Sequence, residues 1–178
     1  MSTTNNLIFL GLRIISWLIF VGLSIEAGAL IVNFIFSVYK PEMVQNLYEK
    51  LDLSAMYQQD SSAFFSMFSF ILVLAILKAV LFYLVVMLVT KINLAKPFDG
   101  FVSKQILNIS YYTFSIGIIS YIARQTAKNL SHKGISTELL SKYWEDSQAF
   151  ILMAAIIYII AIIFKKGIEL QNENDLTV

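Results

Sequence analysis

Four long apolar stretches constrain this chain more than any other feature of its sequence. They run over residues 7–39, 63–90, 106–122 and 149–164. A helix needs about 20 mainly apolar residues to cross a hydrocarbon core of about 30 Å. The sequence therefore predicts an all-α fold in which four transmembrane helices form an antiparallel bundle, with short surface helices in the connections.

Composition supports a membrane location. Of the 178 residues, 58% are hydrophobic and 14% are charged, whereas soluble domains are about 45–50% apolar and about 25% charged. The net charge of +1 gives no field that would attract nucleic acid, so we expect no direct contact with it. The chain has no cysteine and one histidine. Disulfides, thiolate sites and histidine-rich metal sites are therefore excluded, and we predict no cofactor and no metal.

The stretches belong to one domain. No Gly/Ser-rich or Pro-rich linker interrupts residues 1–178, and residues 167–178 form a short polar tail. The first stretch is too long for a signal peptide and lacks a basic leader, so we expect it to be retained. With four spans, both termini lie on one side. Basic residues abut the spans most closely on that side, which favours cytoplasmic termini.

Two charged residues, Glu26 and Lys78, lie deep inside the apolar stretches. Glu26 is thirteen residues after Arg13, and Lys78 is thirteen residues before Lys91. At about 1.5 Å per residue both are roughly 20 Å from the same boundary. One interpretation is an ion pair that fixes the register of the two helices. Alternatives are an ion, proton or substrate site, or no contact at all. Pairing predicts that Lys78→Leu alone damages folding more than Lys78→Leu combined with Glu26→Gln.

The third stretch is the most polar of the four. Tyr112, Ser115, Ser120 and Tyr121 could line a polar pathway, or could hydrogen-bond between helices and to their own backbone. The chain has no Gly-rich phosphate loop, no Gly-x-Ser-x-Gly and no His-Glu-x-x-His motif. We therefore expect a protein that is not an enzyme.

Two short motifs resemble a known family. One is the segment Lys-Pro-Phe-Asp-Gly-Phe at residues 96–101, which precedes the third stretch. The other is the C-terminal pattern, whose matching residues are Gly167, Leu170, Glu173, Asp175, Leu176, Thr177 and Val178. Both are similar to the bacterial four-span membrane family called domain of unknown function 2975. Genes of that family often neighbour a small helix-turn-helix regulator, which the resemblance implies as a cytoplasmic partner.

Two functional classes follow from these features. The first is a noncatalytic membrane regulator or anchor, whose tail (Leu170, Glu173, Asp175, Leu176, Thr177 and Val178) binds the small helix-turn-helix protein. The alternative is a small channel or transporter that uses Glu26 and Lys78. Four helices are too few for a roomy central pore, so this alternative requires a homo-oligomer. In both classes the lipid bilayer is a further partner.

Overall fold

Long helices dominate the structure, a computed structural model that describes residues 3–93 and 98–175. Within these ranges, four helices are long and apolar enough to cross a membrane, namely α1 (Thr3–Tyr39), α3 (Ser61–Lys91), α4 (Gly100–His132) and α5 (Ser147–Asp175). The same described residues include four short helices in the connections, namely η1 (Pro41–Gln45), η2 (Tyr48–Lys50), α2 (Ser54–Gln59) and η3 (Glu138–Tyr143). The predicted all-α fold with four long apolar helices is confirmed.

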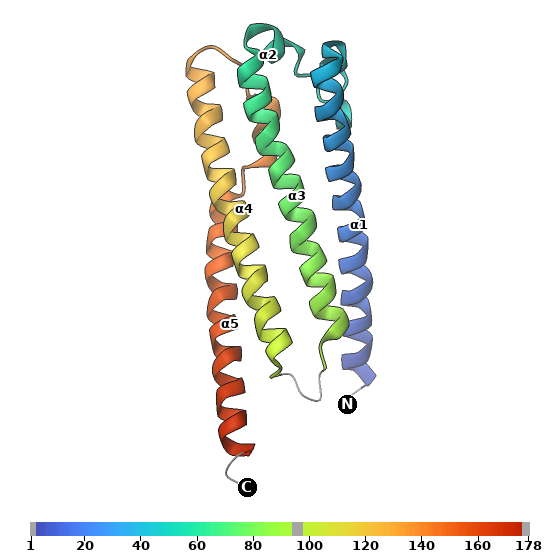
Figure 1. Cartoon of the computed structure of the whole chain (residues 1–178), viewed down its shortest axis with the longest axis vertical. Helices are drawn as coiled ribbons and strands as arrows, with labels where there is room; N and C mark the ends of the chain where they lie inside the picture. The colour runs from blue at the N-terminus through green and yellow to red at the C-terminus, as the bar shows by residue number, and fades with distance from the viewer. Residues whose placement is uncertain (1–2, 94–97, 176–178) are drawn as a thin grey trace.

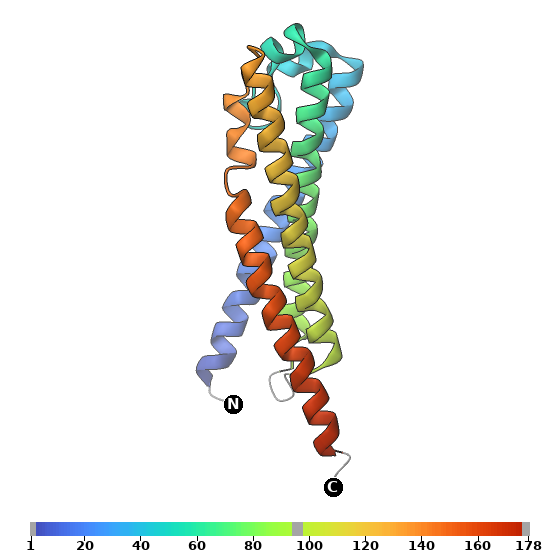
Figure 2. The ribbon, with the colours of Figure 1, turned by 90° about the vertical axis from the view of Figure 1, so that its left-hand side faces the viewer.

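The four long helices form an antiparallel row. Each packs mainly against the next along the chain, and α1 and α5 lie at opposite edges (Figure 1). Both ends of the chain lie at the same end of the row (Figure 1); we call this the terminal end. In the view turned by 90°, α1 slants in the opposite direction from α5, so the two termini diverge (Figure 2).

Contacts at both ends of α1 fix its register against α3. Near the terminal end, the Arg13 guanidinium donates a hydrogen bond to the Thr90 carbonyl oxygen at 3.4 Å. Near the opposite end, the rings of Phe34 and Phe68 stack with their centroids 5.6 Å apart. The two helices therefore stay in one antiparallel register over most of their length.

Carboxylate caps mark where two of the long helices begin. Asp60 Oδ1 accepts hydrogen bonds from the backbone N–H groups of Ser62 and Ala63, at 2.9 and 3.2 Å. Asp99 Oδ1 accepts one from the Phe101 N–H at 3.4 Å. Each cap satisfies N–H groups that the first turn of a helix leaves without partners.

The short helices η1, η2 and α2 cover the end of the row opposite the termini. Buried side chains from these segments, including Val44, Leu53 and Met56, join the same hydrophobic core as α3. A 2.8 Å ion pair between Lys142 and Glu49 connects η3 to η2. These connections therefore close one end of the hydrophobic core.

The connection between α4 and α5 folds back beside α4. The helix α4 continues to His132, ten residues beyond the predicted span, whereas α5 begins level with the middle of α4. Gly117 shows this level, because a Cβ atom there would lie 2.7 Å from the Ile151 side chain and 3.2 Å from the Ser147 carbonyl oxygen. Trp144, in this returning segment, is only 3% exposed. The segment is therefore part of the core.

Candidate functional site

The structure places Glu26 and Lys78 at the same level of the row. The rings of Phe20 and Tyr83 lie 5.8 Å apart, and this register sets Glu26 opposite residues 77 and 78 of α3. Both side chains are half-buried. On α3, Lys78 continues a buried stripe that includes Leu74 and Leu81, which are 1% and 6% exposed.

The two charges do not form an ion pair in this structure. Among the described residues, neither Glu26 nor Lys78 has an ion-pair partner within 4.0 Å or a side-chain hydrogen bond. An unpaired charge at the centre of a membrane helix costs about 2.5–3.5 kcal/mol on insertion scales. The register places the two residues at one level without an ion pair, and the absence of a contact is one of the alternatives left open by the sequence. What the two residues do stays a prediction.

The four polar residues proposed for a pathway point in different directions around α4. Ser120 is buried, Tyr112 is half-buried against the core, and Tyr121 is exposed. The Ser115 hydroxyl donates to the carbonyl oxygen of Tyr111 at 2.9 Å. It therefore hydrogen-bonds to the backbone of its own helix. The structure therefore does not bring this set together on one face.

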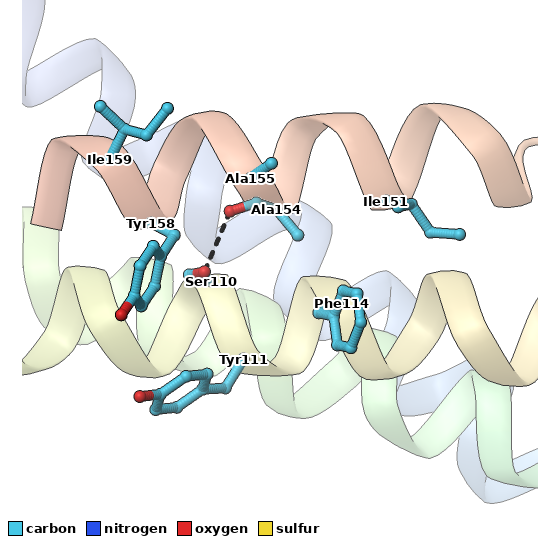
Figure 3. Close-up of a pocket in the computed structure, with 8 residues that line it drawn as sticks. All are labelled: Ser110, Tyr111, Phe114, Ile151, Ala154, Ala155, Tyr158 and Ile159. Carbon is cyan, nitrogen blue, oxygen red and sulfur yellow. Dashed lines mark hydrogen bonds between the residues drawn. The ribbon is translucent and has the colours of Figure 1, made fainter.

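A groove lies instead on the surface between α4 and α5. None of the residues that line it was predicted as a site residue. Its volume is about 360 Å³, and Figure 3 shows its lining, which consists of Ser110, Tyr111, Phe114, Ile151, Ala154, Ala155, Tyr158 and Ile159. The Ser110 hydroxyl donates to the Ala154 carbonyl oxygen at 3.0 Å across the two helices. This bond engages the Ser110 hydroxyl at the bottom of the groove, so the groove offers a mainly apolar surface.

Three buried polar atoms have no hydrogen-bond partner among the described residues. They are Gln105 Oε1, Tyr143 Oη and Ser147 Oγ. Tyr143 and Ser147 flank the point where the returning segment enters α5. No group of three or more His, Asp or Glu residues in the described ranges could hold a metal ion. The polar atoms at this junction therefore form no recognisable metal centre.

The predicted partner-binding tail is largely helical. The helix α5 continues to Asp175 and extends past the ends of the other helices (Figure 1). Leu170 is 60% exposed on this extension, and a 2.7 Å ion pair joins Lys166 to Glu169 beside it. Glu173 also lies on the helical extension, while Leu176, Thr177 and Val178 lie outside the described residues.

Four apolar helices of membrane-spanning length define the chain as a multi-pass helical membrane protein. Residues 46–178 match a family described as a protein of unknown function (DUF2975). The chain belongs to this family, which confirms the resemblance drawn from the two motifs. No curated protein and no solved structure is detectably similar to the chain.

Proposed function

We propose that the chain is a noncatalytic protein of the bacterial inner membrane that holds a soluble partner at the extension of α5. The observation that carries the proposal is an exposed apolar residue, Leu170, on a helix that projects beyond the rest of the row. An exposed apolar side chain flanked by charged residues is a common anchor for a helical partner. The family resemblance supports a small helix-turn-helix protein as that partner.

Co-purification tests this proposal. The full chain is isolated from its native cells in a mild detergent, and bound proteins are identified by mass spectrometry. We expect a small soluble protein at fixed stoichiometry, and we expect Leu170→Ala or removal of residues 174–178 to release it. Leu139→Ala is the matched control, because Leu139 is also well exposed but lies on η3.

Equal amounts of each variant in the membrane fraction would show that insertion is unaffected. Retention of the partner by both tail variants would contradict the proposal. The absence of any co-purifying protein from the unaltered chain would also contradict it.

As a second candidate, we propose an oligomeric channel or transporter. It is favoured by the position of Glu26 and Lys78, which are half-buried, level with one another and without an ion pair among the described residues. Charged residues inside membrane helices often mark an ion or substrate path. Flux into proteoliposomes should then fall with Glu26→Gln and be unchanged by Glu138→Gln, which removes an exposed carboxylate that forms no ion pair with another described residue. Equal flux in both variants would contradict this function.

A further inference from the structure

The outer groove of α4 and α5 has a tyrosine on each wall. The rings of Tyr111 on α4 and Tyr158 on α5 are 6.5 Å apart between centroids. Figure 3 shows the two hydroxyl groups on the same side of the helix pair, with the Tyr111 ring extending toward the Ile159 end of the groove. Because α5 continues from Ile159 toward the terminal end, this is also the end of the groove that is closer to Lys165.

Each tyrosine has a lysine seven residues away along its helix, on the side of the terminal end. Lys104 is seven residues before Tyr111, and Lys165 is seven residues after Tyr158. Seven residues make two helical turns and return to the same face within about 20°. The two helices are antiparallel, so both lysines lie beyond the terminal end of the groove, each in line with its tyrosine.

These two lysines are exposed and available. Neither makes an ion pair or a side-chain hydrogen bond with another described residue. Two other described cations at this end are engaged: Lys91 lies over the Phe101 ring at 5.2 Å, and Lys166 is paired with Glu169. Lys104 and Lys165 therefore add two positive charges beyond the terminal end of the groove, and the Glu169 carboxylate that pairs with Lys166 is also close enough to Lys165 to interact with its charge.

We propose that this groove binds an anionic phospholipid of the bilayer, with its phosphate between Lys104 and Lys165 and one acyl chain lying between Tyr111 and Tyr158. The length fits this occupant. From Lys104 to Phe114 the helix rises about 15 Å, which equals half of a hydrocarbon core of about 30 Å. A chain that starts at the lysines thus ends at the far end of the groove. This site is independent of the function proposed for the α5 extension.

Native mass spectrometry of the purified full chain tests the site. The protein in mild detergent is titrated with dioleoyl phosphatidylglycerol or with dioleoyl phosphatidylcholine, which share acyl chains and differ in net charge. A lysine close to an anionic lipid strengthens binding about fivefold. We therefore expect tighter binding of phosphatidylglycerol, and a loss of about five- to twenty-five-fold in its affinity when Lys104→Gln and Lys165→Gln are combined.

Control variants separate the headgroup from the acyl chain. Lys128→Gln with Lys133→Gln removes two exposed lysines from the opposite end and should leave the preference unchanged. Ala155→Leu fills the groove and should weaken both lipids, whereas Ala149→Leu, at an exposed position on α5 outside the groove, should weaken neither.

Three results would overturn the proposal. One is equal affinity of the unaltered chain for the two lipids. Another is a preference that survives loss of Lys104 and Lys165. The third is a dimer that occupies the groove, seen as a doubled native mass that Ala155→Leu abolishes. Thermal unfolding of each variant in the same detergent establishes that it is folded.

Discussion

At the scale of single residues, Glu26 and Lys78 are charged groups placed deep inside membrane-spanning helices. They are level and half-buried, yet the structure contains no ion pair between them. Each therefore bears its own cost of leaving water, without the attraction that a close pair would supply. Their effects on stability should be separable for the same reason.

We expect Glu26→Gln and Lys78→Leu to change the free energy of unfolding independently. Residues that do not interact show additive effects within about 0.5 kcal/mol. Each single variant should be more stable than the unaltered chain, because it removes an unpaired charge. Unfolding in lipid bicelles of both single variants and the double variant measures the coupling.

The reference is Glu26→Gln combined with Val73→Leu, at an exposed position on α3. The effects of these two changes on the free energy of unfolding should simply add. A double variant that recovers stability lost in Lys78→Leu would instead establish the ion pair and contradict the geometry described here.

At the scale of helices, α4 and the beginning of α5 approach each other closely. Gly117 has no side chain, and the Ile151 side chain together with the backbone of α5 occupies the space that a Cβ atom would need. Small residues allow such close contact between membrane helices. This crossing also holds the returning segment with Leu140 and Trp144 against the core.

We predict that Gly117→Ala lowers the free energy of unfolding by about 1–3 kcal/mol, because an added methyl group in a packed interface forces neighbours apart. The matched control is Gly22→Ala on α1, where nothing lies within 4 Å of the added atom. That change should be neutral or slightly stabilising, since alanine favours the helix. Thermal unfolding in detergent compares the two, and equal effects would contradict the tight crossing.

At the scale of the whole molecule, four spans and a shared terminal end define the topology. Its orientation in the membrane is a prediction from the positions of basic residues. The chain has no cysteine, so single-cysteine variants report the side of each position without a background signal.

We expect Thr3→Cys and Asn172→Cys to react with a membrane-impermeant maleimide only after cells are permeabilised. Ser131→Cys, near the opposite end of α4, should react in intact cells. Labelling of Thr3 and Asn172 from different sides would contradict the fold. Labelling of both in intact cells would reverse the orientation and leave the fold unchanged.

The sequence predicted what depends on apolar length and helical rise, and missed what depends on rotation and contact between helices. The common level of Glu26 and Lys78 followed from counting residues, whereas their separation depends on how α1 and α3 turn toward each other. The seven-residue spacings of Lys104 and Lys165 from their tyrosines are visible in the sequence. Only the register of α4 against α5 brings the two tyrosines into one groove and sets both lysines beyond the same end of it.

The unequal edges of the row have a consequence for the surrounding lipid. From the boundary residue Arg13 to Tyr39, α1 rises about 40 Å, whereas residues 149–164 of α5 rise only about 24 Å. A bilayer adapts to such mismatch by helix tilt and by local thickening or thinning. We therefore expect lipids beside α1 to be stretched and lipids beside α5 to be compressed. The protein would then impose a thickness gradient across its own width.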